Sequence, residues 1–397
     1  MSKFLESAGL MKNPFPPAAT GMGGALDVYK KIYLPQEQSQ AIEDFYSRVA
    51  HGPGAKVFPI IGAYGAGKSA VLKGYMQMFF ESKNIKVFYF DNPGVEFYDL
   101  AESMMRNLGR YEFSKGLFEL CKGHIKRQVN SLFEIKFEDM LIDVYNKHDQ
   151  DNFKNEIASI ILKDLALTDD EEIAHKLAYI VVATYKKRFF ERKDFMSSNT
   201  NAVVADSHED KFFHAIISAI IRIFNVDGVA FLIDEFEEVT FSKGMTKSKT
   251  YEYLSTFRRL IDLSEKVSLW VAVAMTPEAL EQTKELNNAF VARFVNINTK
   301  IELNPLSEYD ITEWLKWWLN TARQENSNYR DTIFPFPECF PHQMAEDANR
   351  CYPRTLVKTC FAILADAEEN QLPVPLTPKY TSEMITTFFN DGVHDEV

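Results

Sequence analysis

Hydrophobic and polar positions along the chain predict an alternation of strands and helices. Short apolar runs predict buried strands at 57–61, 86–90, 229–233, 267–274 and 295–303. Helical periodicity separates them, at 36–49, after 68, at 248–264 and at 277–290. Strands that alternate with helices imply a parallel sheet covered on both faces. We therefore expect an α/β fold with a parallel five-stranded sheet, although Pro59 is unusual in a central strand.

The remaining segments lack strands of similar quality. Residues 94–227 have a helical pattern and predict an insertion at about 95–225, of roughly three to six helices. The pattern is helical again after Pro305 and predicts a C-terminal helical lid domain over 305–390. Proline and glycine within 13–24 predict irregular structure. The expected domains are an N-terminal extension (1–34), a core (35–304) that the insertion interrupts, the lid, and a tail (391–397).

A glycine-rich segment at 62–69 matches the phosphate-binding pattern G-x-x-x-x-G-K-[ST] at every fixed position. Glycines let successive backbone N–H groups point at phosphates, and the helix that follows adds its positive end. We expect Lys68 to bridge the β- and γ-phosphates of ATP and Ser69 to ligate Mg²⁺. The expected nucleotide-binding residues of this segment are Gly62, Ala63, Tyr64, Gly65, Ala66, Gly67, Lys68, Ser69 and Ala70. The alternative is a chance glycine-rich turn, but the required strand before it and helix after it are both predicted.

Two acidic residues follow the apolar run 229–233 directly. Parallel α/β sheets bind ligands at the carboxyl ends of their strands, which is where Asp234 and Glu235 lie. We expect Asp234 to hold the Mg²⁺ shell and Glu235 to polarise the attacking water. Glu237 and Glu238 are expected to be ordinary solvated loop residues.

In the same order along the chain, these and later motifs resemble those of AAA+ ATPases. The strand at 267–274 leads into Met275-Thr276-Pro277, which resembles the sensor 1 position and makes Thr276 a candidate contact to the γ-phosphate or the lytic water. Arg293 ends a predicted helix where AAA+ proteins carry an arginine finger for the neighbouring subunit's ATP. The alternative for Arg293 is a helix-terminal arginine at the solvent edge.

Two further segments are similar to AAA+ motifs. Pro353-Arg354 resembles the sensor 2 pair, so Arg354 would reach the γ-phosphate from the lid. Tyr33 and Leu34 resemble the segment that packs on adenine, with ordinary core packing as the alternative. The sensors are similar to the initiator-like group, which includes origin-recognition and transposition-regulating ATPases. The chain departs from that group in its large insertion and in the absence of room for a C-terminal winged helix.

Composition limits the class of protein and of partner. The chain has 397 residues and a formal net charge of −12, which argues against a surface that is basic throughout. No apolar run reaches the length of a membrane span. Four cysteines (Cys121, Cys339, Cys351, Cys360) have no paired spacing, which favours free thiols in a reducing cytoplasm. We expect a cytoplasmic protein that needs ATP and Mg²⁺ and forms ATP-dependent homo-oligomers, as rings or filaments.

Local basic runs leave the target of the ATPase open. A predicted helix at 177–192 ends in Lys186-Lys187-Arg188 and Arg192-Lys193, with Tyr185, Phe189 and Phe190 among them. A loop after the acidic pair carries Lys243, Lys247 and Lys249, and Arg258 and Arg259 follow it. These residues suit a nucleic-acid backbone, and solvated faces are the alternative. One hypothesis is an ATPase that assembles on DNA in replication, transposition or defence against foreign DNA. The other is a nucleotide-switched scaffold that recruits a partner effector protein.

Overall fold

A computed structural model of the chain describes residues 2–17, 34–50, 56–95, 97–124, 136–146, 150–190, 207–241, 245–263, 267–294 and 300–390. Its sheet has five parallel strands: β1 (Val57–Gly62), β2 (Ile85–Phe90), β3 (Gly228–Ile233), β4 (Leu269–Met275) and β5 (Ile301–Leu303). They lie in the order β2-β3-β4-β1-β5. This confirms the expected α/β fold and parallel sheet. The last strand was expected from 295, but 295–299 lie outside the described residues.

Burial along the strands follows their place in the sheet. Every residue of β1, β3 and β4 is buried, as expected for strands covered on both faces, whereas three of the six residues of the edge strand β2 are half-buried. Pro59 does stand in β1, between β4 and β5 in the strand order. Because β5 has three residues and its last, Leu303, lies beside Gly62, Pro59 precedes the stretch that β5 can pair.

Aromatic side chains fix helices to both faces of the sheet. Trp270 pairs with Ala230 in the β3–β4 register, so Trp270 and Phe231 point to opposite faces. On one face, Tyr46 of α3 (Gln36–Val49) stacks on Trp270 with ring centroids 4.6 Å apart. Phe80 of α5 (Gln77–Ser82) packs on the same ring at 5.7 Å. On the other face, Phe213 of α11 (Ser207–Phe224) lies 5.5 Å from Phe231.

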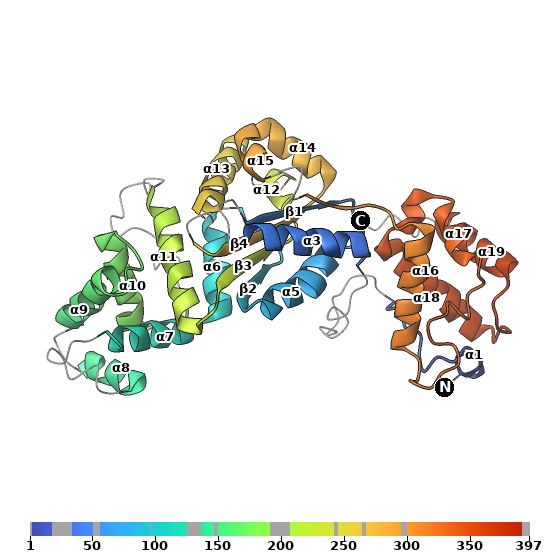
Figure 1. Ribbon diagram of the computed structural model, residues 1–397, viewed down its shortest axis with the longest axis horizontal. Helices are drawn as coiled ribbons and strands as arrows, with labels where there is room; N and C mark the ends of the chain where they lie inside the picture. The colour runs from blue at the N-terminus through green and yellow to red at the C-terminus, as the bar shows by residue number, and fades with distance from the viewer. Residues whose placement is uncertain are drawn as a thin grey trace. The chain divides into compact units, whose positions relative to one another are not determined.

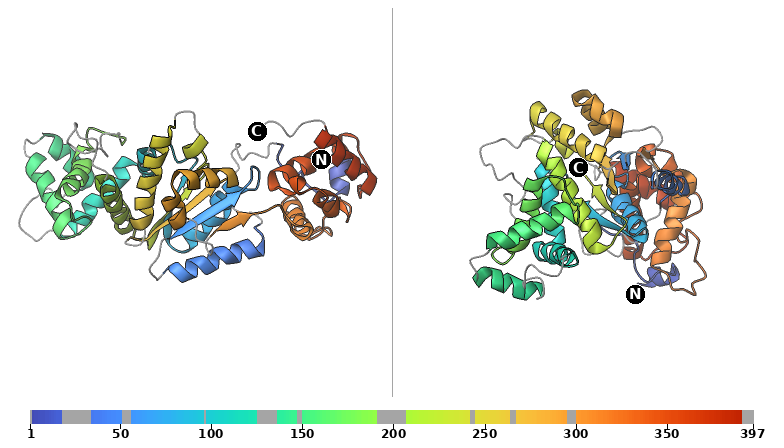
Figure 2. Two further views of the ribbon diagram at one scale, coloured as in Figure 1. Left: turned by 90° about the horizontal axis from the view of Figure 1, so that it is seen from above. Right: turned by 60° about the vertical axis from the view of Figure 1, so that its left-hand side comes forward.

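The regular secondary structure of the insertion is all helical in its described part, and α11 is its last helix. The others are α6 (Phe97–Leu108), α7 (Arg110–Lys122), α8 (Phe137–Asn146), α9 (Gln150–Lys163) and α10 (Glu171–Ala183). In two views α8, α9 and α10 lie away from the strands, with α11 between them and the sheet (Figure 1, Figure 2). The predicted helix at 177–192 was wrong in both limits. Asp170 caps α10 by accepting from the N–H groups of Glu172 and Ile173, and the helix ends at Ala183.

Helices also follow β3 and β4. They are α12 (Glu238–Phe241), α13 (Lys247–Leu263), α14 (Pro277–Leu286) and α15 (Asn288–Phe294). The chain forms two compact units, of which one comprises 41–60 and 76–301 and the other comprises 1–40, 61–75 and 302–397. The domains expected from the sequence are consecutive stretches of the chain, whereas each compact unit combines separate stretches. The expected domain limits stay predictions.

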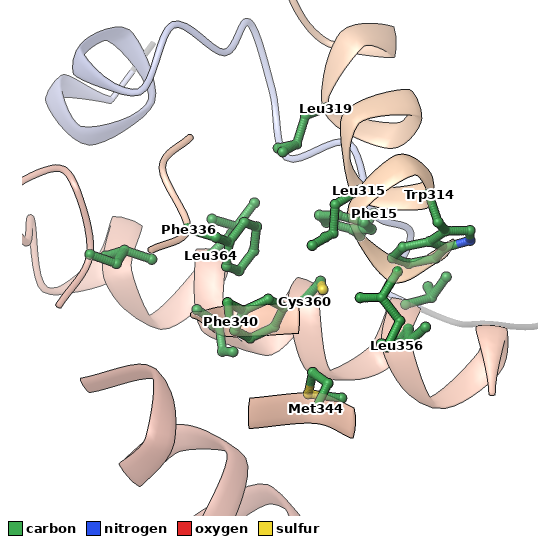
Figure 3. Close-up of a cluster of buried hydrophobic side chains, with 14 of the residues drawn as sticks. Phe15, Trp314, Leu315, Leu319, Phe336, Phe340, Met344, Leu356, Cys360 and Leu364 are labelled. Atoms are coloured by element: carbon green, nitrogen blue, oxygen red, sulfur yellow. The ribbon is translucent and has the colours of Figure 1, made fainter. Parts of the chain in front are cut away.

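The C-terminal helices have their own hydrophobic core (Figure 3). It is built from α16 (Glu308–Thr321), α17 (Phe340–Ala345), α18 (Pro353–Glu369) and α19 (Pro378–Asn390). The N-terminus, expected only as an extension, contributes α1 (Lys3–Ser7) and the buried rings of Phe4 and Phe15. Phe15 stacks on Trp314 of α16 with ring centroids 5.7 Å apart. The first residues of the chain therefore complete the core of the C-terminal helices.

Candidate functional site

The glycine loop, residues 62–69, leads from the end of β1 into the short helix α4 (Lys68–Ala70). Gly65 and Gly67 have φ values of +77° and +92°. Glycine adopts this left-handed region without the steric cost of a side chain. The Lys68 ammonium is buried and donates to the carbonyl oxygens of Gly62 at 3.0 Å and Ala63 at 3.4 Å. The loop is therefore a tight curl of backbone around its own lysine.

The start of α18 lies directly against this loop. The Arg354 N–H donates to the Gly65 carbonyl at 3.2 Å. A Cβ on Gly65 would lie 3.0 Å from the Arg354 Cβ, and a Cβ on Gly67 would lie 3.7 Å from the Pro353 ring. The structure thus brings the predicted sensor 2 residue to the glycine loop, and the close approach depends on the missing side chains at Gly65 and Gly67.

Around the loop the predicted residues differ in exposure. Ser69 and Tyr64 are exposed, Ala63 and Ala70 are half-buried, and Ala66 is buried. Leu34 is half-buried, whereas Tyr33 lies outside the described residues. After α4 the helix continues as a π-helix at Val71–Met76 before α5. Such π-turns are rare overall, and those that occur are often found at functional sites. Nothing in the sequence pattern signalled it.

The carboxylate corner, formed by Tyr89, Asp234, Glu235 and Glu237, lies at the carboxyl ends of β2 and β3. Asp234 is 3% exposed, and both of its carboxylate oxygens accept hydrogen bonds. Tyr89 Oη donates to Oδ2 at 2.8 Å, and the Glu235 N–H donates to Oδ1 at 3.0 Å. Tyr89 was not predicted, because its partner is set by the pairing of β2 with β3 and not by a local motif.

Glu235 combines backbone strain with an altered acidity. It has φ +47°, a left-handed conformation that is uncommon for residues other than glycine and clusters at functional sites. Glu235 is exposed as a whole, but its carboxyl group is partly desolvated, which raises its pKa. The pKa is raised further by the negative charges of Asp234, Glu237, Glu238 and Asp91. A raised pKa brings a carboxylate closer to the range in which a general base works best.

The two glutamates that follow differ from each other. Glu238 is exposed at the start of α12, as expected, but the solvated-loop prediction for Glu237 was wrong because Glu237 is 7% exposed. The Phe236 N–H donates to Ala274 O of β4, which turns the chain inward directly after Glu235. That turn buries the ring of Phe236 among Phe257, Phe290 and Phe294, and the next residue is buried with it.

Thr276 stands at the end of β4 and caps α14. Its Oγ1 accepts from the Ala279 N–H at 3.2 Å, and the residue is 1% exposed. Threonine favours this N-cap position, and Pro277 suits the first turn that follows. One lone pair of the Thr276 hydroxyl accepts the capping hydrogen bond, and the hydroxyl proton can still be donated. Thr276 is therefore already a structural residue, whatever else its hydroxyl does.

Arg293 lies in the last turn of α15 and is exposed. Its guanidinium forms an ion pair with Asp262 of α13. Exposed ion pairs contribute about 0–1 kcal/mol, so this contact can exchange for another anion at little cost. An exposed arginine at a helix end is what both the arginine-finger prediction and its solvent-edge alternative expect, so the finger role of Arg293 stays a prediction.

The oxygen donors near both regions suit Mg²⁺. Ser69 offers an exposed hydroxyl and Asp234 a buried carboxylate with free lone pairs. Mg²⁺ in proteins usually takes one or two carboxylates and completes its shell with waters and substrate phosphates. Within the ranges that the structure describes, no group of three or more His, Cys, Asp or Glu side chains could hold a metal alone. Each of the two donors by itself is of a kind that Mg²⁺ accepts beside phosphate oxygens and waters, and the assignment of Ser69 and Asp234 as Mg²⁺ ligands stays a prediction.

The basic runs are only partly described. The turn after α10 contains Lys186, Lys187 and Arg188, so these residues are not part of the helix. Phe189 is 76% exposed beside them, whereas Phe190 is buried against Phe113. Lys247 and Lys249 are exposed at the start of α13, and Arg258 and Arg259 of that helix are half-buried. Arg192, Lys193 and Lys243 lie outside the described residues.

Among the helices that the structure describes, none is long and apolar enough to cross a membrane. No known protein family and no curated protein sequence matches the chain. Its fold is similar to that of the Aeropyrum pernix ORC2 protein, solved as ADPNP–ADP complexes, with a TM-score of 0.44. The two chains are 13% identical over 90% of this chain and 71% of that one. At this level the likeness carries no argument about function, which has to come from the residues of this chain.

Proposed function

We propose that this chain is an ATPase of the AAA+ kind that binds ATP with Mg²⁺ at the glycine loop. The observation that carries the proposal is the loop itself. Two of its glycines are left-handed, its lysine is held inside the curl, and its serine hydroxyl is exposed at the helix start. Backbone curls of this kind bind phosphate through their N–H groups.

Each part of the site has a proposed role in hydrolysis. Lys68 leaves the carbonyls of Gly62 and Ala63 for the phosphates, and Ser69 and Asp234 hold Mg²⁺. The ion, when bound, neutralises charge on the phosphate oxygens. Glu235 accepts a proton from the attacking water, which its raised pKa favours. Support for joining the loop and the carboxylate corner at one nucleotide is that β1 and β3 are parallel strands of one sheet, so both segments leave the same edge.

The remaining predicted residues serve the γ-phosphate in this proposal. Thr276 orients the lytic water with the proton that its cap does not use. Arg354 senses the γ-phosphate from α18, and Arg293 acts on the ATP of a neighbouring copy. Tyr33 and Leu34 remain the proposed adenine contacts.

Mixing two inactive variants tests the shared site. One variant, Arg293→Ala, lacks the finger but keeps an intact glycine loop. The other, Lys68→Ala, cannot bind nucleotide at its own loop but keeps an intact finger. If Arg293 acts in trans, a mixture restores part of the ATP turnover, because some interfaces pair an intact loop with an intact finger. Intact assembly of both variants with no recovered turnover contradicts that role.

We propose further that hydrolysis drives assembly on nucleic acid, in a mobile-element, replication or anti-foreign-DNA context. The support is the turn after α10, where three consecutive cations precede the exposed Phe189 in sequence. Such combinations bind a phosphate backbone and stack a base. Binding is measured by sedimentation with DNA at two salt concentrations, comparing Arg188→Gln/Phe189→Ala with the control Lys154→Gln in α9. Weaker, less salt-dependent binding of the first variant alone is expected.

The alternative function is an oligomeric scaffold that switches with nucleotide and recruits an effector protein. The net charge of −12 favours it, because a negative chain is repelled by nucleic acid outside local basic patches. ATP-dependent oligomers whose turnover is indifferent to DNA support the scaffold and contradict assembly on nucleic acid.

A further inference from the structure

The strongest unassigned feature of the site is the hydrogen bond between Tyr89 and Asp234. Tyr89 lies on β2 opposite Leu232 of β3, so Asp234 is the next residue of β3 on the same face of the sheet. Diagonal neighbours of this kind are within reach of a long aromatic side chain. The phenol oxygen lies 2.8 Å from Asp234 Oδ2.

This bond leaves the buried carboxylate little freedom to rotate. Oδ1 is held by the Glu235 N–H at 3.0 Å and Oδ2 by the Tyr89 hydroxyl. Each carboxylate oxygen has a second lone pair, and the two fixed bonds determine where those lone pairs point. A phenol keeps its proton at neutral pH, and the Tyr89 hydroxyl therefore acts as the donor in this bond.

We propose that Tyr89 is a positioning residue that orients Asp234 for a magnesium nucleotide. The hydroxyl of Tyr89, and not its ring, sets the Mg²⁺ concentration at which nucleotide binding is tightened. The inference rests on the proposed ATP site and adds a residue that the sequence motifs do not contain. Partners that orient a metal ligand typically change metal affinity by about 10–100-fold when removed.

The test is Tyr89→Phe, which keeps the ring and removes only the donor. Binding of a fluorescent ATP analogue is titrated with Mg²⁺ and, separately, measured in EDTA. Metal-free binding should match wild type, because the glycine loop is unchanged. The Mg²⁺ concentration that gives half of the Mg²⁺-dependent tightening should rise about tenfold.

The lid domain offers a matched control. Tyr380 donates to Asp366 Oδ2 at 2.6 Å, as Tyr89 donates to Asp234 Oδ2 at 2.8 Å. Tyr380→Phe therefore loses the same kind of bond far along the chain from every residue proposed to bind metal. Its Mg²⁺ dependence should equal wild type, and thermal unfolding of both variants shows whether they lose similar stability.

Each outcome decides a different claim. An unchanged Mg²⁺ dependence in Tyr89→Phe, or an equal shift in both tyrosine variants, overturns the positioning role while wild-type binding upholds the ATP site. A wild-type chain that binds no nucleotide, with or without Mg²⁺, overturns the proposed function and this inference together.

Discussion

The glycine loop and the carboxylate corner reach their geometry by different routes. The loop is one continuous segment, and its curl is held by backbone conformation and by Lys68 bonding to Gly62 and Ala63. The corner combines Tyr89 of β2 with Asp234 and Glu235 after β3, joined by a hydrogen bond between residues 145 positions apart. The loop is a local structure, whereas the corner exists only when the sheet has formed.

Because the two regions form differently, substitutions in them should have different effects. A change in the loop should remove nucleotide binding directly, because the proposed phosphate donors are the loop's own backbone N–H groups and Lys68. A change in the corner should spare binding and affect chemistry, metal use or stability. The following variants test that division, from the largest expected effect to the smallest.

Lys68→Ala should abolish binding, with turnover reduced about 100-fold or more, because charged hydrogen bonds to phosphate are lost. Equilibrium binding of ATP and steady-state phosphate release measure the two effects. Lys284→Ala, an exposed lysine of α14 paired with Glu281, is the control and should leave both unchanged. Full ATP affinity in Lys68→Ala would contradict the loop's role.

Glu235→Gln should reduce turnover about 100-fold or more, because general bases contribute about 10²–10⁴-fold, and should leave ATP affinity intact. Glu285→Gln, at an exposed glutamate of α14, serves as the control. The pH dependence of wild-type turnover gives a second check. Because the pKa of Glu235 is raised, activity should fall as the pH drops through a value above that of an ordinary glutamate. An acid limb at the ordinary value would argue against Glu235 as the base.

The same raised pKa predicts a gain in stability. Folded Glu235 binds its proton at a higher pH than the unfolded chain does, so wild-type stability falls as pH rises through that window. Glu235→Gln should therefore unfold at a higher temperature than wild type at neutral pH, without nucleotide. The difference should shrink as the pH falls below the ordinary glutamate pKa. A constant difference across pH would mean that the charge is not its cause.

Gly65→Ala and Gly109→Ala compare strain with and without a clash. Both glycines have positive φ, at +77° and +82°, but a Cβ meets Arg354 at 3.0 Å in the first case and nothing within 4 Å in the second. Gly109 combines φ +82° with ψ 131°, a sparsely populated region that costs a residue with a side chain about 1–3 kcal/mol, so Gly109→Ala should lose about that much free energy of unfolding. Gly65→Ala should lose more, together with nucleotide binding. Equal losses in denaturant titrations would argue that α18 does not press on the loop.

The smallest effect concerns two helix caps. Thr276→Ala and Ser307→Ala each remove a side chain that accepts from the first turn, in α14 and α16, and should each cost about 1 kcal/mol. Only Thr276→Ala should also reduce turnover, and Thr276→Ser should restore it. If turnover follows stability alone in both variants, Thr276 is a cap and not a sensor.

The sequence predicts the loop and the acidic pair because their patterns are local. Glycines, Lys68 and Ser69 stand at fixed spacings, and Asp234 follows an uninterrupted apolar strand. Tyr89 could not be predicted as a partner, since its target depends on which strand pairs with β2 and in which register. The apolar run at 86–90 indicated a strand but gave no sign of what its tyrosine would meet.

Two other differences have identifiable causes. The end of α10 was placed too late because the basic and aromatic residues after Ala183 continue a helical pattern, while Thr184 bonds back to Ile180 O and the chain turns away. The N-terminus was treated as an extension because of its prolines and glycines. Its apolar residues Phe4, Leu5, Leu10 and Phe15 were the available signal that it joins a core.

The most direct test of the account follows the fate of bound ATP in one turnover. Radiolabelled ATP and Mg²⁺ are mixed with excess wild-type chain or Glu235→Gln, and the bound nucleotide is identified after the free nucleotide is removed. The account predicts ADP on the wild type and unhydrolysed ATP on Glu235→Gln, with neither on Lys68→Ala. Intact ATP on the wild type, or ADP formation that survives Lys68→Ala, would contradict it.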